Sequence, residues 1–223
     1  MAMNMFRSVI LGAPASGKGT ISSRIVNKFQ LDHISSGDKL RLQIKNKTAI
    51  GNEVSKYTST GKFVPDDIMI KFIMNEINNA RGPWLLDGFP RTRSQCEALW
   101  TQQPLDLAIN LVVPFEVIID RVKNRWVHLP SGRVYNIDFN APKVAGKDDV
   151  TGEALTQRED DKPEVVQRRL EDYQMKTQPV IDFFREKGIL EDFEGRTSDE
   201  IWPKVLECLI RHIPIQLTSQ QNV

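Results

Sequence analysis

The sequence predicts an α/β fold in which a parallel sheet is covered by helices on both faces. Short apolar runs that end at glycine or proline alternate with longer stretches whose apolar residues recur at helical spacing. The 223 residues are enough for one substantial domain with a buried core and small inserts. We therefore expect a single domain built around one sheet.

Three apolar runs predict buried strands, and two weaker signals add to them. The clear runs are 8–11, 84–87 and 107–113, and the weaker ones lie around Ile34 and at 189–190. Helical spacing of apolar residues predicts helices over the intervening segments, roughly 18–29, 37–47, 50–59, 66–80, 92–101, 115–125, 163–187 and 198–212. Because strands alternate with helices, we expect the strands to run parallel.

One segment, 126–161, departs from this alternation. Prolines and glycines recur along it, with polar and aromatic residues between them. This composition predicts a small β-rich insert that stands off the main sheet. An insert of this kind in a compact domain usually serves the function of the protein.

Charge and cysteine content limit the classes of partner. Thirty Lys and Arg against 29 Asp and Glu leave a net charge of +1, which does not support a nucleic-acid or membrane-surface partner. No stretch approaches the ~20 apolar residues of a membrane span, and we expect no secretory signal at the start. Cys96 and Cys208 follow no metal-ligand or disulfide spacing, so we expect reduced, structural thiols. Cytosol and organelle interior both stay open.

A glycine-rich loop, residues 12–20 (Gly-Ala-Pro-Ala-Ser-Gly-Lys-Gly-Thr), joins the first predicted strand to the first predicted helix. A polyphosphate needs many donors at close range, and backbone N–H groups supply them where side chains do not crowd the approach. Gly12, Gly17 and Gly19 leave that room, and Lys18 adds a positive charge near the N-terminus of the helix. The loop therefore predicts a site for the phosphates of a nucleotide.

A second motif, Asp-Gly-Phe-Pro-Arg at 87–91, closes the second predicted strand. In sheets of this kind, ligands bind at the carboxyl ends of the strands. The carboxylate of Asp87 suits Mg²⁺ held through water, and the guanidinium of Arg91 suits bidentate pairing with a phosphate. The motif predicts that the phosphoryl group is transferred beside this strand.

A third segment, Ser-Ser-Gly-Asp-Lys-Leu-Arg at 35–41, adds a further candidate for anion binding. We expect Ser36 to cap the next helix and Arg41, one turn later, to face the same anion. Because such caps are common, this segment gains weight only beside the other two motifs.

Together the three segments make the chain similar to the adenylate kinase (nucleoside monophosphate kinase) family in its long-lid form, over about residues 7–213. Further motifs that carry the resemblance lie at 61–66, 120–121, 125–128, 131–135 and 158–163. The segments that most resemble the mitochondrial-matrix GTP:AMP phosphotransferase branch of the family are 35–37, 125–128, 157–164 and 201–203.

The resemblance implies a P-loop NTPase-type fold and a transferase activity. The γ-phosphoryl group would pass reversibly from a nucleoside triphosphate, GTP or also ITP, to AMP, giving GDP and ADP in nucleotide homeostasis. The core would comprise 1–34, 65–123 and 162–223, with a helical NMP-binding insert at 35–64 and a lid insert at 124–161. The implied partners are small-molecule nucleotides, the implied state is a monomer, and the implied location is the mitochondrial matrix, with the cytoplasm as the alternative.

The resemblance also implies roles for individual residues. The donor nucleotide would contact Ala15, Ser16, Gly17, Lys18, Gly19, Thr20, Arg121, Arg125, Val134, Tyr135 and Arg196. AMP would contact Ser36, Arg41, Lys62, Phe63, Val64, Gly88, Phe89, Pro90, Arg91, Gln95, Arg158 and Arg169. The catalytic charges would be Lys18, Arg91, Arg125, Arg158 and Arg169. Gln95 suits adenine because an amide pairs with both a donor and an acceptor on the ring edge.

Mg²⁺, bound with the nucleotide and held by Asp87 through water, is the cofactor that the resemblance implies. Many long-lid relatives also hold Zn²⁺ in the lid through four ligands, mostly Cys. The equivalent positions in this chain are His128, Ser131, Asp148 and Thr151. Because none of them is Cys, we expect a hydrogen-bonded polar cluster there and no structural zinc.

Ala15 departs from the family pattern, which has Gly at this position of the loop. Its methyl group is expected to crowd the turn slightly while activity survives. Three alternatives stay open: ATP as the preferred donor, a catalytically weak nucleotide-binding interaction protein, and a cytidylate or uridylate kinase. The presence of Lys18, Asp87 and the arginines disfavours the second, and the long lid and Gln95 disfavour the third.

Overall fold

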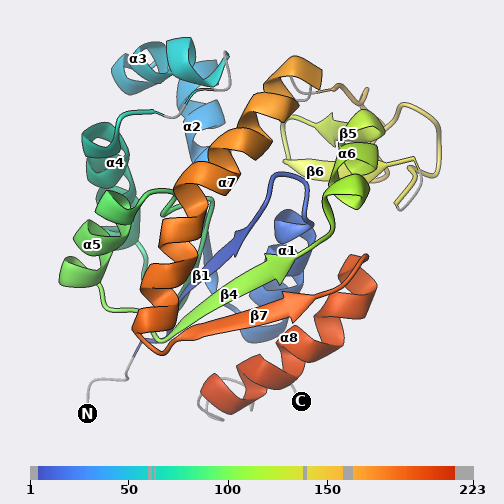
Figure 1. Cartoon of the computed structure of the whole chain (residues 1–223). Helices are drawn as coiled ribbons and strands as arrows, with labels where there is room; N and C mark the ends of the chain where they lie inside the picture. Colours follow the sequence, from blue (N-terminus) through green and yellow to red (C-terminus); the bar gives the residue numbers. More distant parts are fainter. Residues whose placement is uncertain (1–4, 60–61, 63, 138–139, 158–162, 214–223) are drawn as a thin grey trace.

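A computed structural model describes residues 5–59, 62, 64–137, 140–157 and 163–213 (Figure 1). Within these residues the main sheet has five parallel strands in the order β2-β3-β1-β4-β7, and a separate antiparallel pair is formed by β5 and β6. The strands are β1 (Arg7–Gly12), β2 (Asp32–Ser35), β3 (Trp84–Asp87), β4 (Leu107–Val112), β5 (Arg125–His128), β6 (Arg133–Asn136) and β7 (Leu190–Glu194). The predicted α/β fold is confirmed.

The weaker strand signals at Ile34 and 189–190 correspond to β2 and β7. Each of these strands buries only one side chain completely, Ile34 in β2 and Phe193 in β7. β1, β3 and β4 instead bury most of their residues. A strand at the edge of a sheet needs fewer apolar residues, and its sequence pattern is therefore short and weak.

The helices begin and end within two residues of the predicted bounds. They are α1 (Lys18–Phe29), α2 (Ser36–Lys45), α3 (Ala49–Thr58), α4 (Asp66–Asn78), α5 (Arg93–Gln102), α6 (Phe115–Lys123), α7 (Pro163–Glu186) and α8 (Ser198–His212). Hydroxyl side chains fix four of the starts, because each accepts a hydrogen bond from a first-turn amide: Ser35, Thr48, Thr92 and Thr197. The prediction that Ser36 caps α2 was wrong by one residue, since Ser36 is the first residue of the helix. No helix in the described ranges is long and apolar enough to span a membrane.

The core consists of two apolar layers, one on each face of the sheet. Neighbouring residues of one strand enter different layers: Val9 packs with side chains of α4, α5 and α7, whereas Ile10 packs with side chains of α1 and α8. Figure 1 shows α7 crossing one face of the sheet while α1 and α8 lie behind the other. Burial on both faces explains why the central strands are mostly apolar instead of alternating between apolar and polar residues.

Two inserts extend from this core. Helices α2 and α3 pack against each other, and β5 and β6 form the second insert with isolated bridges at Val127–Thr156, Asn136–Asn140 and Lys147–Ala154. The prediction of a β-rich segment at 126–161 is thus confirmed in its described part. In the view of Figure 1 the two inserts lie on opposite sides of the amino-terminal half of α7.

Candidate active site

The loop between β1 and α1 follows a path that depends on its glycines. Gly12 and Gly17 have φ of +144° and +95°, a region that side chains rarely adopt. A Cβ on Gly12 would lie 2.7 Å from the Oγ of Ser16, and one on Gly17 would lie 2.7 Å from the Oγ of Ser198. A Cβ on Gly19 would meet nothing within 4 Å, so the loop is open on that side.

The charges and dipoles of this loop favour an anion. The ammonium group of Lys18 lies over the loop and donates to the carbonyls of Gly12 and Ala13 at 2.7 and 2.8 Å. Helix α1 has no side-chain cap and no acidic residue in its first turn, so its positive end is not neutralised locally. Ser16 is buried, and its Oγ has no hydrogen-bond partner within the described residues.

Ala15 has a strained backbone conformation. The sequence predicted slight crowding by its methyl group, and the structure shows that the φ angle is also unfavourable. Its φ is +59°, in the left-handed region, which costs a non-glycine residue about 1–2 kcal/mol. Its carbonyl accepts a hydrogen bond from Nη1 of Arg121 at 3.1 Å. Ala15 therefore lowers the stability of the folded protein through its left-handed backbone conformation, which a residue with a Cβ adopts at a cost.

Arg121 connects the phosphate loop to the segment between β7 and α8. Besides its bond to Ala15, its Nη2 donates to the carbonyl of Arg196 at 2.6 Å. Burial lowers the pKa of Arg121, and the charge of Glu200 opposes that shift. A cavity of about 260 Å³ adjoins these residues and is lined by Val117, Asp120, Arg196, Thr197 and Glu200. The structure thus brings the predicted donor residues Ala15, Arg121 and Arg196 together.

Asp87 ends β3, beside Ile10 of β1 and Ser35 of β2 in the sheet register. It is nearly buried, and its Oδ2 accepts a hydrogen bond from the hydroxyl of Ser22 at 3.3 Å. The Nε2 atom of His33 lies 3.8 Å from the same oxygen. A carboxylate held at this edge of the sheet is the type of oxygen ligand that Mg²⁺ takes. The described residues hold no cluster of three or more His, Cys, Asp or Glu placed for a metal ion.

A second group of predicted anion ligands gathers around Gly88. A Cβ on Gly88 would lie 2.6 Å from the Oγ of Ser36 and 3.1 Å from Nη2 of Arg91. The Nε of Arg91 donates to the Gly88 carbonyl at 2.6 Å. A Cβ on Gly37 would lie 3.2 Å from both terminal nitrogens of Arg41. Ser36 and Arg91, which are far apart in the sequence, therefore meet at Gly88, and Arg41 approaches Gly37, the neighbour of Ser36.

Gln95 is buried, although the sequence alone does not distinguish it from a surface residue of its helix. Only 2% of it is exposed. Its Oε1 accepts from the backbone N–H of Arg91 at 2.8 Å, and its Nε2 donates to Oδ1 of Asp66 at 2.6 Å. Asp66 was not predicted as a site residue. Its contact with Gln95 joins two helices, and such a contact leaves no local pattern in the sequence.

Only some of the remaining predicted AMP ligands lie among the described residues. Val64, Phe89 and Pro90 are buried, and Lys62 is exposed with its backbone N–H bonded to the Tyr57 carbonyl at 3.0 Å. Phe63 and Arg158 lie outside the described residues, as does the side chain of Arg169, whose backbone belongs to α7.

The lid residues predicted to contact the donor differ in exposure. Arg125 begins β5 and is half-buried. Val134 is 39% exposed, whereas Tyr135 is 5% exposed. The hydroxyl of Tyr135 donates to Oδ1 of Asp148 at 2.9 Å and accepts from the N–H of Asp149. The Tyr135 side chain is therefore part of the lid interior, and Val134 offers the accessible side chain.

The expected polar cluster in the lid is confirmed. The ring nitrogens of His128 lie 2.7 Å from the Oγ of Ser131 and 2.5 Å from a carboxylate oxygen of Glu153. The hydroxyl of Thr151 donates to Asp148 at 3.0 Å. Arg133 was not predicted as a member, yet it donates to both oxygens of Asp148, at 2.8 and 2.6 Å. This pairing holds the pKa of Asp148 well below its usual range.

The two cysteines are free and buried, as expected of structural thiols. Burial raises the pKa of Cys96 to about 12 and also raises that of Cys208. Both thiols are therefore protonated at neutral pH and are poor nucleophiles.

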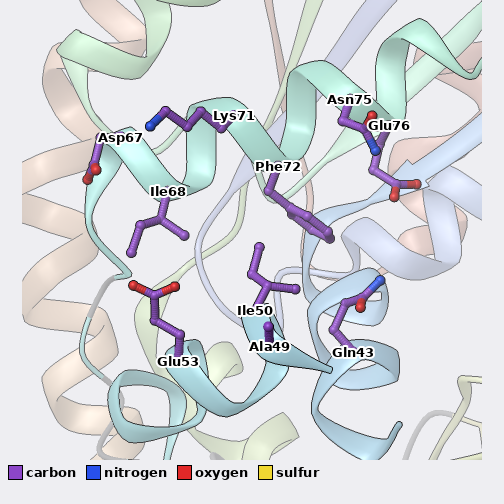
Figure 2. Close-up of a pocket in the computed structure, with 10 residues that line it drawn as sticks. All are labelled: Gln43, Ala49, Ile50, Glu53, Asp67, Ile68, Lys71, Phe72, Asn75 and Glu76. Carbon is purple, nitrogen blue, oxygen red and sulfur yellow. The ribbon is translucent and has the colours of Figure 1, made fainter. Parts of the chain in front are cut away.

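A larger cavity lies apart from all of these residues. Figure 2 shows a groove between α3 and α4, of about 680 Å³, with Ile50, Ile68 and Phe72 at its apolar centre. Polar side chains such as Glu53 and Lys71 line it as well (Figure 2). None of its lining residues belongs to the predicted nucleotide sites.

Comparisons with known proteins agree with this geometry. The family model described as "Adenylate kinase" matches residues 10–189. A Drosophila melanogaster protein named "GTP:AMP phosphotransferase, mitochondrial" is 52% identical over 204 residues, which cover 91% of this chain and 94% of the relative. A Saccharomyces cerevisiae protein of the same name is 44% identical over 214 residues, 91% of this chain and 92% of the relative. The chain belongs to the adenylate kinase family.

Proposed function

We propose that this protein is a nucleoside monophosphate kinase that transfers the γ-phosphoryl group from GTP to AMP, giving GDP and ADP. The observation that carries the proposal is a pair of anion sites at neighbouring strands. The loop with Lys18 follows β1, and Ser36 and Arg91 meet at Gly88, directly after β3, which pairs with β1; Arg41 lies one turn along α2 from Ser36 and approaches Gly37. Two anion sites at neighbouring strand ends suit in-line transfer, in which the donor phosphates occupy one site and the AMP phosphate occupies the other.

The proposed mechanism relies on position and charge, because phosphoryl transfer requires little covalent participation by the protein. Lys18 contacts the transferring group from the donor side, and Arg91 contacts it from the acceptor side. Arg125, Arg158 and Arg169 complete the positive surroundings. The donor phosphates lie along 15–20, and the base lies near Arg121, Val134, the Tyr135 backbone and Arg196. No side chain acts as a nucleophile.

Mg²⁺ fits this proposal at Asp87. When bound with the nucleotide, the ion supplies charge that offsets the phosphate oxygens. Asp87 would hold it through water, and the hydroxyl of Ser22 keeps the carboxylate oriented toward the edge of the sheet. The polar lid cluster of His128, Ser131, Asp148 and Thr151 occupies its positions with mutual hydrogen bonds, which supports a lid without zinc.

The proposed division of the chain follows from the two inserts. Residues 35–64 would bind AMP, with Gln95 contacting its adenine, and residues 124–161 would close as a lid over the donor. Closure keeps water from a phosphoryl group that is otherwise open to hydrolysis. The protein would act as a monomer on small-molecule nucleotides.

The choice of GTP as donor is supported by the names of the relatives and is tested with purified enzyme. GTP, ITP and ATP are compared as donors at a fixed AMP concentration, and kcat/KM is measured for each. We expect the highest value with GTP. If ATP gives the highest value, the protein is an ATP:AMP phosphotransferase and the donor assignment is wrong.

A mitochondrial-matrix location is proposed because both relatives are named as mitochondrial. Fractionation of cells that produce the full-length protein, with protease added to intact and to permeabilised mitochondria, tests it. We expect the protein to be protected until the inner membrane is opened. Recovery in the cytosolic fraction contradicts this location without affecting the proposed reaction.

A further inference from the structure

Asp66 has both carboxylate oxygens committed to the segment that begins α5. Its Oδ1 accepts from the Nε2 of Gln95 at 2.6 Å, and its Oδ2 accepts from the hydroxyl of Thr92 at 2.7 Å. Asp66 is the first residue of α4, so these bonds connect the starts of two helices. The carboxylate is therefore fixed at two points and cannot turn away from Gln95 without losing one of them.

The amide of Gln95 is fixed in turn by partners of opposite character. The backbone N–H of Arg91 can only donate, so the atom that faces it at 2.8 Å must be the carbonyl oxygen. The carboxylate of Asp66 accepts, so the atom that faces it must be the NH₂ group. Turning the amide over would place donor against donor and acceptor against acceptor. Because Gln95 is only 2% exposed, water cannot relieve those contacts.

The orientation of this amide decides which purine it can pair with. An NH₂ group has a second hydrogen and a carbonyl oxygen has a second lone pair, so each can make one more hydrogen bond. The six-membered ring of adenine offers an acceptor at N1 and a donor at its amino group. Hypoxanthine and guanine offer the reverse, a donor at N1 and an acceptor at their 6-oxo group. An amide held in one orientation therefore distinguishes the two classes, and one free to turn over does not.

We propose that Asp66 is the positioning residue for acceptor selectivity: it orients the Gln95 amide so that AMP is accepted and 6-oxopurine monophosphates are rejected. The inference rests on the proposed function, in which Gln95 contacts the base of AMP. Thr92 supports the arrangement, because its hydroxyl donates to Asp66 while its Oγ1 accepts from the backbone N–H of Gln95 at 3.2 Å. Asp66 itself contacts no substrate.

The test compares Asp66→Ala with Asp67→Ala. Both residues lie in the first turn of α4, but Asp67 lines the groove of Figure 2 and makes no bond to Gln95 there. The ratio of kcat/KM for AMP to that for IMP is measured at a fixed donor concentration. Loss of one buried hydrogen bond predicts a fall of about tenfold in this ratio for Asp66→Ala, with KM for AMP rising more than kcat falls. Asp67→Ala is expected to leave the ratio unchanged.

A conservative variant separates positioning from support of the helix. Asp66→Asn keeps an oxygen of the same reach opposite the Gln95 amide, so it is expected to restore most of the selectivity. If Asp66→Ala weakens AMP and IMP equally, or keeps the ratio of the unaltered enzyme, the role in selectivity is refuted. A wild-type enzyme that does not phosphorylate AMP instead refutes the proposed function, and a selective enzyme whose ratio survives Gln95→Ala refutes the role of Gln95.

A measurement on the unaltered protein covers the case in which Asp66→Ala does not fold. The side-chain NH₂ of Gln95 is observed by ¹⁵N NMR in the absence of nucleotide. Rotation about the C–N bond of a side-chain amide is slow, so the two protons give separate signals in either case. A fixed orientation predicts that the proton facing Asp66 exchanges with solvent more slowly than the other. Two signals that exchange equally fast overturn the inference.

Discussion

At the scale of single residues, Lys18 and Arg91 are expected to carry the largest share of catalysis. Each supplies a charge to the transferring group, so Lys18→Ala or Arg91→Ala should reduce kcat by at least about 10²-fold. Steady-state rates with GTP and AMP measure the effect. The exposed Lys28 and Arg93 provide matched controls, and their alanine variants should retain full turnover. Near-normal kinetics for both Lys18→Ala and Arg91→Ala contradict the mechanism.

Ala15→Gly is expected to stabilise the protein. The left-handed backbone at Ala15 costs about 1–2 kcal/mol, and glycine removes this cost while adding about 0.4–1 kcal/mol of unfolded-state entropy, so the net gain is about 0.5–1 kcal/mol. Urea unfolding measures it. Ala13→Gly is the control, because Ala13 is buried and has no positive φ, so its substitution should destabilise. A lower midpoint for Ala15→Gly disproves the strain.

The site residues that the sequence predicts most directly are those within contiguous motifs. Gly17 and Lys18 stand out because a phosphate loop needs them at fixed spacing. Ser198, which limits the space at Gly17, comes from a segment far away in sequence and has no motif of its own. The same is true of Asp66, whose proposed role depends on its hydrogen bond with the Gln95 amide. Contacts between distant segments depend on the folded chain and leave no local pattern.

At the scale of elements, the lid is expected to be sensitive to acid. Arg133 holds the pKa of Asp148 well below the value of about 3.9 that an unfolded aspartate has. The carboxylate therefore stabilises the folded lid fully above about pH 5, and this contribution is lost as the pH falls below about 4. Asp148→Asn should lower Tm at pH 7 and reduce its dependence on pH between about 5 and 3.

Calorimetry at several pH values checks this expectation for the lid. Asp182→Asn is a suitable comparison, since Asp182 is a half-buried carboxylate on α7 that pairs with Arg185 outside the lid. It should leave the pH dependence of Tm unchanged. An Asp148→Asn variant with the full pH dependence of the unaltered protein would show that Asp148 does not govern acid sensitivity.

Most elements were predictable because local chemistry and burial agree. Helix α8 has apolar spacing, a Thr197 cap and acidic residues in its first turn, so its bounds match the prediction. Helix α6 was predicted two residues too long, because the helical spacing of Ile118 and Val122 continues to Trp126, which lies in β5 and pairs with β6. Pairing between strands is a property of the folded insert, and the sequence indicated only its composition.

At the scale of the whole molecule, the two apolar layers share one sheet and should unfold together. Leu85 and Leu86 are neighbours in β3 that are fully buried in different layers. Each substitution to alanine is expected to cost about 2–5 kcal/mol. Leu42→Ala, at a position that is 51% exposed, should cost about 0.5 kcal/mol or less. Urea unfolding followed by circular dichroism and by fluorescence should give coincident transitions, and separate transitions contradict a shared core.

The strand order also determines when the chain can fold during its synthesis. β4 and β7 are neighbours, with Ala108 beside Leu190, yet the β-rich insert and all of α7 lie between them in sequence. The ribosome must therefore deliver most of the chain before β4 acquires its second neighbour. Until then β4 presents an unpaired edge to other chains. We therefore expect a nascent chain that stalls before residue 190 to expose this edge of β4, to need chaperones and to lack kinase activity.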